Sequence, residues 1–429
     1  MKILKLPAYY DPEQVASSHL TNDVNEAFVR EGYTIENYVP IPGRGIPKEV
    51  RKQYKNMRYQ ESADGHIIVH RFSMFPEGKS TVQRAVRYIL VNIIQYYKGI
   101  SAKNIDLIYS GSTPPTQGIL CSRVKKKLSK KYGRTVPFIY VLQDIFPDSL
   151  VNADMIRKDS FIWKIGRKIE NYTYSNADRI IVIGDDYKRN LTEKGVPGDK
   201  IAVIPNWVNT DNVVPIERTQ NILTDRYHIN PDSFIVCYSG NIGRSQNLLL
   251  LIELAKRVRD RYSDILFVII GEGVQKDELA GLKEEQQLSN MLILPFQKYE
   301  EISHVFSLGD VGLLISRKGV GLASVPSKTW GIMAASRPVL ASIDRQSYAG
   351  VLIDKVGCGM VSDADDLDGL EAALIHMYRN RTFCRQLGLR GREYVRRELN
   401  KDIATRKYID VIKSVAGMEG SLKSTGGKR

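Results

Sequence analysis

Short apolar segments alternate with amphipathic helical segments along almost the whole chain, and this alternation limits the fold more than any other sequence feature. It is typical of α/β proteins, in which helices cover both faces of a parallel sheet. The strands expected in the first half are Lys2–Leu6, Ile67–Arg71, Leu107–Ser110, Phe138–Leu142, Arg179–Ile183 and Ile201–Ile204. The helices expected there are Leu20–Glu31, Gly118–Tyr132 and Trp163–Ser175.

A second series of strands and helices begins after the segment 205–231. Its expected strands are Phe234–Ser239, Leu266–Ile270, Met291–Leu294, Val311–Ile315, Val339–Ala341 and Gly359–Val361. Its expected helices are Asn247–Tyr262, Lys276–Leu288, Tyr299–Ser307, Lys328–Ala335, Leu367–Tyr378 and Thr382–Leu399. One open sheet rarely holds so many strands, and a chain of 429 residues suits two domains. We therefore expect α/β domains at 1–210 and 211–400, a helix within 401–416 and a disordered polar tail at 417–429.

The charge balance points to an acidic partner, because the formal net charge is +14 and the sequence pI is about 9.4. Nucleic acid, anionic lipid and phosphorylated substrates all fit this charge. No stretch reaches the roughly 18 apolar residues of a membrane-spanning helix, and the start of the chain resembles a first strand, not a signal peptide. Four widely spaced cysteines are typical of reduced thiols in the cytosol: Cys121, Cys237, Cys358 and Cys384. We expect a cytoplasmic protein whose membrane contact is peripheral.

Two glycine-bearing turns follow consecutive expected strands of the second half. The first is Gly240-Asn241-Ile242-Gly243-Arg244, and the second is Gly271-Glu272-Gly273. Such turns let backbone N–H groups approach an anion, and the arginine guanidinium can pair with a diphosphate. Because ligands of open α/β sheets bind beyond the carboxyl ends of strands, both turns are expected to border one crevice. The alternative for either turn alone is a tight turn without a ligand.

A third element is Pro326-Ser327-Lys328 at the start of an expected helix. Ser327 suits the N-cap, and Lys328 falls in the first turn, where a cation opposes the helix dipole. A bound diphosphate would supply the anion that makes this arrangement favourable. The alternative is a solvated lysine that extends outward.

Several motifs in fixed order resemble the bacterial glycosyltransferases of family 4, in the O-antigen and capsule branch that includes fucosaminyltransferase-like proteins. The motifs are Tyr9–Glu13, Asp144–Asp148, Ala177–Ile183, Ile204–Val208, Tyr238–Gly243, Pro326–Lys328 and Gly357–Gly359. The resemblance implies the GT-B fold, with two Rossmann-like domains facing across a cleft. It implies a nucleotide-sugar donor in the C-terminal domain, a last helix that crosses back to the first domain, and an acceptor side in the N-terminal domain.

The resemblance also implies an activity: transfer of a sugar, with retention and without a metal or other cofactor, to a saccharide carried on a lipid diphosphate. A UDP-sugar is the expected donor, with an N-acetylated deoxyhexose as one candidate. Diphosphate contacts fall on Gly240, Asn241, Arg244, Ser327 and Lys328, of which Arg244 and Lys328 stabilise the leaving group. The turn Gly271–Gly273 is expected near the nucleoside, with Glu272 beside the base or ribose.

One departure concerns a pair of glutamates that many family members carry before a Met-Ala segment. Alignment on Met333-Ala334 places Ala323 and Gly331 at those positions, so both carboxylates are missing. Asp344 and Ser347 are candidates to compensate.

On the acceptor side, Asp144 follows an expected strand and could orient or deprotonate an acceptor hydroxyl. For a retaining transfer we favour orientation, and a turn-capping aspartate is the alternative. Glu13 and His19, near the end of the first strand, are further acceptor-side candidates. The Asp-x-Asp patterns within 363–368 could hold a metal ion, but they precede a helix and fit N-terminal capping better.

The N-terminal half carries basic runs at 44–58 and 121–134 and an amphipathic stretch at 84–97. These segments could dock on an anionic membrane surface, or they could be solvated helix faces. Two other classes remain possible: a UDP-sugar epimerase of the same architecture, and a basic nucleic-acid-binding protein. The second has no zinc spacing, RNP motif or helix-turn-helix signal, so no nucleic-acid partner is expected. A nicotinamide dehydrogenase is disfavoured because the first strand of neither half leads into G-x-G-x-x-G.

Overall fold

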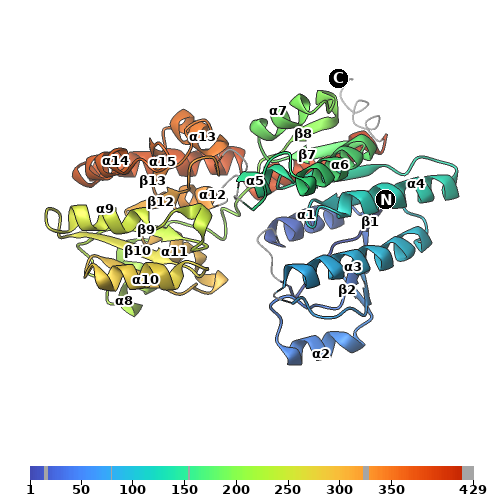
Figure 1. Cartoon of the computed structure of the whole chain (residues 1–429), viewed down its shortest axis with the longest axis horizontal. Coiled ribbons are helices and arrows are strands. Elements are labelled where there is room, and N and C mark those ends of the chain that lie inside the picture. The colour runs from blue at the N-terminus through green and yellow to red at the C-terminus, as the bar shows by residue number, and fades with distance from the viewer. Residues whose placement is uncertain (14–17, 79, 153–154, 322–327, 418–429) are drawn as a thin grey trace, which may run out of the picture. The chain divides into compact units, whose positions relative to one another are not determined.

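The computed structural model describes residues 1–13, 18–78, 80–152, 155–321 and 328–417, and the chain forms two compact units (Figure 1). Unit 1 comprises Met1–Pro205 and the chain from Ala404 onward, and unit 2 comprises Asn206–Ile403. The segment 418–429, which was expected to be disordered, lies outside the described residues.

Unit 1 contains an eight-stranded sheet in the order β3-β4-β2-β1-β5-β6-β7-β8. All neighbours are parallel except β3, which pairs antiparallel with β4 at the edge. The strands are β1 (Lys2–Lys5), β2 (Thr34–Pro40), β3 (Tyr59–Ser62), β4 (Ile67–Phe72), β5 (Leu107–Gly111), β6 (Phe138–Leu142), β7 (Arg179–Val182) and β8 (Ile201–Val203).

Strands β2 and β3 were not predicted from the sequence. Strand β2 carries buried Glu36 and Asn37 in place of an apolar run, and Lys2 neutralises Glu36 across a 2.6 Å ion pair. Strand β3 lies at the edge of the sheet and its side chains are mostly exposed, so its sequence has no apolar pattern that would indicate a strand.

The helices of unit 1 are α1 (Ser18–Arg30), α2 (Lys48–Asn56), α3 (Thr81–Ser101), α4 (Gln117–Tyr132), α5 (Asp148–Asn152), α6 (Phe161–Asn176) and α7 (Asp185–Glu193), with the short 3₁₀ helix η1 (Gly198–Lys200). Helix α3 packs against α4, and α4 packs against α6, so these three helices form one layer over the sheet (Figure 1).

Helix α16 (Lys401–Val415) belongs to unit 1 although it lies at the other end of the chain. Its Tyr408 is buried against Tyr109 of β5, with ring centroids 6.5 Å apart, and its Lys413 pairs with Glu31 at 2.6 Å. Phe28 of α1 contacts the same Tyr109 ring. Helices α1 and α16 therefore share one side of β5.

Unit 2 contains a six-stranded parallel sheet in the order β11-β10-β9-β12-β13-β14. Its strands are β9 (Phe234–Ser239), β10 (Ile265–Ile270), β11 (Met291–Leu294), β12 (Val311–Ile315), β13 (Val339–Ser342) and β14 (Gly359–Ser362). The chain leaves β9 toward β10 and β11, then returns to place β12 on the other side of β9. Adjacent strands whose connections leave in opposite directions open a crevice at their carboxyl ends.

The helices of unit 2 are α8 (Ile222–Arg226), α9 (Leu250–Arg259), α10 (Lys276–Glu285), α11 (Ile302–Ser307), α12 (Lys328–Ala334), α13 (Tyr348–Val356), α14 (Leu367–Arg379) and α15 (Arg381–Glu398), with 3₁₀ helices η2 (Arg218–Gln220), η3 (Arg244–Gln246) and η4 (Tyr299–Glu301). Helix α13 was not predicted. It begins at the Ser347 cap and ends at Gly357 in the left-handed conformation.

All four cysteines are buried and free. In the part of the chain that the structure describes, none of the helices has the length and apolar character needed to cross a membrane.

Candidate active site

The two glycine turns of unit 2 lie side by side at the carboxyl ends of neighbouring strands β9 and β10. The backbone N–H of Ile242 donates to the carbonyl of Glu272 at 2.8 Å, and the N–H of Gln275 donates to the carbonyl of Ile242 at 3.0 Å. A Cβ on Gly271 would lie 1.9 Å from the carbonyl oxygen of Gly240, and one on Gly273 would lie 2.2 Å from that of Ile242. Only glycine fits at these two positions, because any side chain would separate the turns.

Lys328 points inward, toward the first of these turns. Its Nζ donates to the hydroxyl of Tyr238 at 2.8 Å and lies 3.9 Å from the centre of that ring. A Cβ on Gly240 would be only 2.9 Å from the same nitrogen, so the ammonium group packs directly against the turn. The alternative of an outward, solvated lysine is therefore wrong.

The surroundings of Lys328 favour an anionic ligand. Burial lowers the pKa of the Lys328 ammonium to about 7, because few polar groups replace its hydration. Tyr238 is itself buried, and its hydroxyl donates to the carbonyl of Asn241 at 2.6 Å. This hydroxyl thus accepts from the lysine and fixes the turn at the same time. A bound anion would restore the charged form of Lys328.

Arg244 lies in η3, on the connection that follows β9, and its side chain is exposed. The expected helix does not follow the turn at once, because α9 begins only at Leu250. The N–H of Arg317, after β12, donates to the carbonyl of Ser245 at 3.0 Å. The connection that carries Arg244 is therefore fastened to the one that leads toward Lys328, at the same edge of the sheet.

Glu272 is half exposed, and its carboxylate pairs with Lys276 of α10 at 2.6 Å. Asn241 is exposed at the other turn, where its amide donates to Gln246 at 3.3 Å. Ser327 lies outside the described residues, so its predicted contact with diphosphate has no structural counterpart.

The missing glutamates have a partial structural explanation. A Cβ on Gly331 would lie 2.3 Å from the ring of Phe306, so α12 leaves no space for a side chain there. Asp344 accepts from the N–H groups of Gly319 and Gly321 at 2.9 and 3.0 Å. Ser347 caps α13 by accepting from the N–H of Gly350. Asp344 and Ser347, the candidates to replace the missing carboxylates, thus both accept hydrogen bonds from backbone N–H groups. Ala323 lies outside the described residues.

Asp144 follows β6 in unit 1, and its side chain is accessible to solvent. The protein atoms around it nevertheless raise the pKa of its carboxyl above the usual value by desolvation. Buried Tyr187 of α7 lies within electrostatic range of both Asp144 and Asp186. Asp186, which the sequence analysis did not single out, also has a raised pKa because of burial. An accessible carboxyl with a raised pKa suits an interaction with a hydroxyl group.

Glu13 does not have the free carboxylate that an acceptor-side role requires. It is 3% exposed, and its Oε1 accepts from the N–H groups of Gly43 and Arg44 at 2.7 and 2.8 Å. The side chain therefore fastens the loop after β1 to the loop after β2. His19 lies in the first turn of α1 with an exposed side chain.

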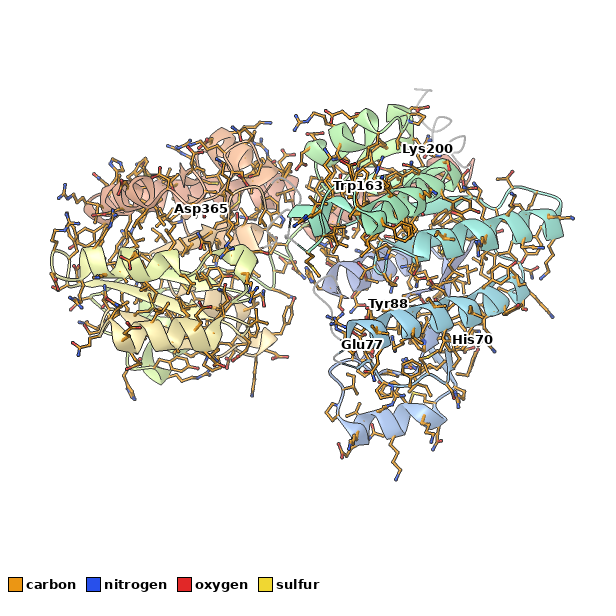
Figure 2. The ribbon with its side chains drawn as sticks, viewed as in Figure 1. His70, Glu77, Tyr88, Trp163, Lys200 and Asp365 are labelled. Atoms are coloured by element: carbon orange, nitrogen blue, oxygen red, sulfur yellow. The ribbon has the colours of Figure 1, made fainter. Side chains whose placement is uncertain are left out.

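The Asp-x-Asp segment acts as predicted for a cap. Asp366 accepts from the N–H of Gly369 at 2.9 Å at the start of α14. Asp365, labelled in Figure 2, accepts from the amide of Asn247 at 2.6 Å and from the N–H of Lys318 at 3.3 Å. Among the described residues, no group of three or more His, Cys, Asp or Glu side chains is placed to hold a metal ion.

Two family models match the chain and together span most of it. The model described as Glycosyltransferase Family 4 matches residues 21–212, and the model described as Glycosyl transferases group 1 matches residues 220–394. WcaI of Escherichia coli strain K12, named as a colanic acid biosynthesis glycosyl transferase, is 24% identical over 419 residues, covering 96% of this chain and 100% of WcaI.

Solved structures show the same architecture. Sucrose-phosphate synthase from Thermosynechococcus elongatus superposes with a TM-score of 0.73 at 15% identity, over 97% of this chain and 99% of that one. Anabaena HepE in complex with UDP-glucose gives a TM-score of 0.68 at 13% identity, over 96% and 100% of the two chains.

Two parallel-sheet α/β domains with these neighbours define the GT-B fold, and the family models and WcaI identify a glycosyltransferase. The chain belongs to glycosyltransferase family 4, as its ordered motifs predicted.

Proposed function

We propose that this enzyme transfers a sugar from a UDP-sugar to a saccharide carried on a lipid diphosphate, with retention, during synthesis of a cell-surface polysaccharide such as O-antigen or capsule. The observation that carries the donor half is the packing of Lys328 against Gly240 at the edge formed by β9, β10 and β12. A cation, an exposed arginine and two backbone turns converge there. HepE, a structural neighbour with the same fold, has been crystallised with UDP-glucose.

In the transfer, the bond between the anomeric carbon and the diphosphate oxygen breaks, and a bond to the acceptor oxygen forms. Charge develops on the departing diphosphate, and Lys328 with Arg244 would stabilise it in place of a metal ion. The acceptor proton passes to the leaving phosphate oxygen. Asp144 would orient the acceptor hydroxyl, since its carboxyl is accessible and its raised pKa favours sharing a proton.

The acceptor half is supported by a broad apolar and basic face on the layer α3–α4–α6. Helix α3 exposes Val82, Val86, Ile89, Leu90, Ile93 and Tyr97, and α6 exposes Phe161, Ile162 and Ile165. Val82 is 71% exposed and Phe161 is 79% exposed, which is unusual for side chains of this size. Helix α4, between them, exposes Arg123, Lys126, Lys127, Lys130 and Lys131.

An apolar face with basic residues at its centre fits an anionic leaflet, in which apolar side chains enter the interface and cations meet lipid headgroups. We therefore propose that the enzyme acts on a lipid-linked acceptor at the cytoplasmic face of the membrane. The stretch 84–97 predicted for docking lies in α3, while α6 contributes a part that the sequence analysis did not include.

The decisive experiment incubates the purified protein with a panel of nucleotide sugars and a polyprenyl-diphosphate saccharide, and follows product mass. We expect one sugar mass to be added to the acceptor, with no requirement for divalent cations and with the anomeric configuration of the donor retained by NMR. Isomerisation of the donor without an acceptor product would support the epimerase instead. A product with inverted configuration would contradict the proposed mechanism.

A further inference from the structure

A cluster of arginines and tyrosines occupies the region beyond the carboxyl ends of β1, β2 and β4 in unit 1. We call it the arginine–tyrosine cluster, and it consists of Tyr9, Tyr10, Arg44, Arg51, Tyr54, Arg71, Arg87 and Tyr88. Figure 2 labels Tyr88 on α3 and Glu77 on the loop before it, which mark its position. Nothing in the proposed transfer uses these side chains.

Arg87 is the most unusual member, because its side chain is completely buried. Its Nε donates to the carbonyl of Phe75 at 3.2 Å, and its guanidinium lies 5.8 Å from the ring centre of Tyr9. Both terminal nitrogens, Nη1 and Nη2, are buried and have no hydrogen-bond partner. A buried guanidinium with unused donors is strongly unfavourable unless a ligand or water satisfies it.

Arg71, near the end of β4, is a second buried arginine with unused hydrogen-bond donors. It is 5% exposed, and its Nη2 donates to the carbonyl of Asp11 at 2.8 Å, but its Nε and Nη1 are buried without partners. Its guanidinium lies 4.6 Å from the ring centre of Tyr54 and 5.8 Å from that of Tyr10. Burial lowers the pKa of Arg71, as it does that of Arg51.

Of the carboxylates near these arginines, Glu13 and Glu77 are already engaged in hydrogen bonds, and Asp11 interacts electrostatically with Arg71. Glu13 interacts electrostatically with Arg51 and Arg71, but its oxygens accept from backbone N–H groups. Glu77 accepts from the hydroxyl of Tyr9 at 2.5 Å, and that hydroxyl also lies 2.5 Å from the hydroxyl of Tyr88. The positive charge of Arg87 repels that of Arg51. The Nη1 and Nη2 groups of Arg51 donate to the carbonyls of Pro42 and Met74. The unused donors therefore belong to Arg71 and Arg87.

We propose that the arginine–tyrosine cluster is a second anion site, which binds the phosphate or diphosphate group of the acceptor. Guanidinium groups bind phosphate oxygens through paired N–H donors, and four buried donor nitrogens here are unused. Arg87 lies on α3, the helix that also exposes the apolar row from Val82 to Tyr97. A lipid diphosphate matches both features, since the charged group would meet the arginines and the isoprenoid chain would lie along apolar side chains.

This inference rests on the proposed function only for the identity of the ligand, and the test separates the two. The full-length protein carrying Lys328→Met, which disables the donor site, is titrated with inorganic pyrophosphate and with farnesyl diphosphate by isothermal titration calorimetry. We expect both to bind. Adding Arg87→Met should weaken both by roughly tenfold or more, the effect of losing a charge-assisted hydrogen bond. Adding Arg396→Met, at an exposed position of α15 in unit 2, should leave both unchanged.

Equal affinity for pyrophosphate and farnesyl diphosphate would assign the site to a free polyphosphate. Tighter binding of farnesyl diphosphate would assign it to a lipid-linked diphosphate. Both results support an anion site. Absence of binding by both, or equal binding with and without Arg87, overturns it. If Arg87→Met does not fold, Arg87→Lys and Arg71→Met replace it, and pyrophosphate must still raise the Tm of the Lys328→Met protein. UDP binding is measured separately on the wild type, so loss of the donor proposal would leave this result intact.

Discussion

The ammonium nitrogen of Lys328 lies 2.8 Å from the hydroxyl oxygen of Tyr238, and this contact joins the start of α12 to the end of β9. The two residues are far apart in sequence, and strand pairing between β9 and β12 brings them together. The proposed donor site is therefore assembled by the topology of unit 2.

The first prediction concerns the pH dependence of donor binding. Burial lowers the pKa of Lys328 to about 7, so the free enzyme loses this cation as the pH rises above that value. We expect UDP affinity, measured by calorimetry from about pH 6 to about pH 9, to fall progressively above pH 7. Lys328→Arg should bind UDP without this dependence, and Lys328→Met should bind weakly throughout. A wild-type affinity that stays constant over the range contradicts the assignment.

The second prediction concerns the interlocked glycine turns. Gly271→Ala places a methyl group 1.9 Å from the carbonyl of Gly240, so we expect a loss of about 1–3 kcal/mol in the free energy of unfolding and loss of UDP binding. The matched control is Gly281→Ala in α10, where a Cβ meets nothing within 4 Å. That change should stabilise the protein by about 0.5–1 kcal/mol. Urea unfolding of both variants tests the contrast.

The third prediction concerns Asp144. Asp144→Asn should lower kcat by roughly a hundredfold while leaving the KM for the donor unchanged, because the residue is proposed to orient only the acceptor. Desolvation raises the pKa of Asp144, so wild-type activity should fall as the pH drops through that value and the carboxylate takes up a proton. Asp144→Asn should not show this fall in activity at acidic pH. Asp199→Asn, at an exposed position in η1, is the control; near wild-type turnover of Asp144→Asn would remove the role.

The fourth prediction concerns stability. Lys5 is buried, donates to Asn25 at 2.5 Å, and has its pKa lowered by burial from 10.5 to about 7. Between these values the unfolded chain binds more protons than the folded protein, so the free energy of unfolding rises with pH, by at most about 1.4 kcal/mol per unit. Below pH 7 the contribution is constant. Lys5→Met combined with Asn25→Leu should flatten this part of the curve, as followed by urea unfolding; an unchanged slope would mean that Lys5 keeps its charge.

The fifth prediction concerns the apolar and basic face of the layer α3–α4–α6, which is proposed to dock on a membrane. Ile89→Asp with Ile93→Asp on α3 should reduce binding to vesicles that contain anionic lipid, because two charges replace exposed apolar contacts. Neutralising Lys126 and Lys127 of α4 should weaken binding by about 1 kcal/mol for each charge and make it less sensitive to salt. Leu389→Asp on α15, exposed in unit 2, is the control. Sedimentation in which all variants behave alike excludes this surface.

Much of the fold could be predicted because buried parallel strands are continuous apolar runs. Strands β9, β11 and β12 begin and end where the sequence placed them. Strand β2 escaped prediction because its two buried polar residues need partners from elsewhere, such as Lys2 for Glu36. Periodicity cannot indicate a strand whose burial depends on a distant ion pair.

The adjacency of the two glycine turns could be predicted from the sequence, but the direction of single side chains could not. The turns at Gly240 and Gly271 follow from local sequence, whereas the inward position of Lys328 depends on Tyr238, ninety positions away in the chain. Glu13 has the residue type expected of an acceptor contact, yet Gly43 and Arg44 occupy its carboxylate. The unused donors of Arg71 and Arg87 can be recognised only when their neighbours are placed.

Because Tyr408 of α16 packs on Tyr109 of β5, the fold of unit 1 can be completed only after the C-terminal helix has been synthesised. A ribosome releases β5 early, but the helix that covers this tyrosine emerges only after all of unit 2 has been made. The sheet of unit 1 therefore exposes an apolar patch to solvent while unit 2 is translated and folds. Nascent chains stalled before residue 401 should consequently be captured by chaperones and cleaved by proteases at unit 1, and chains released from the ribosome with α16 should be protected.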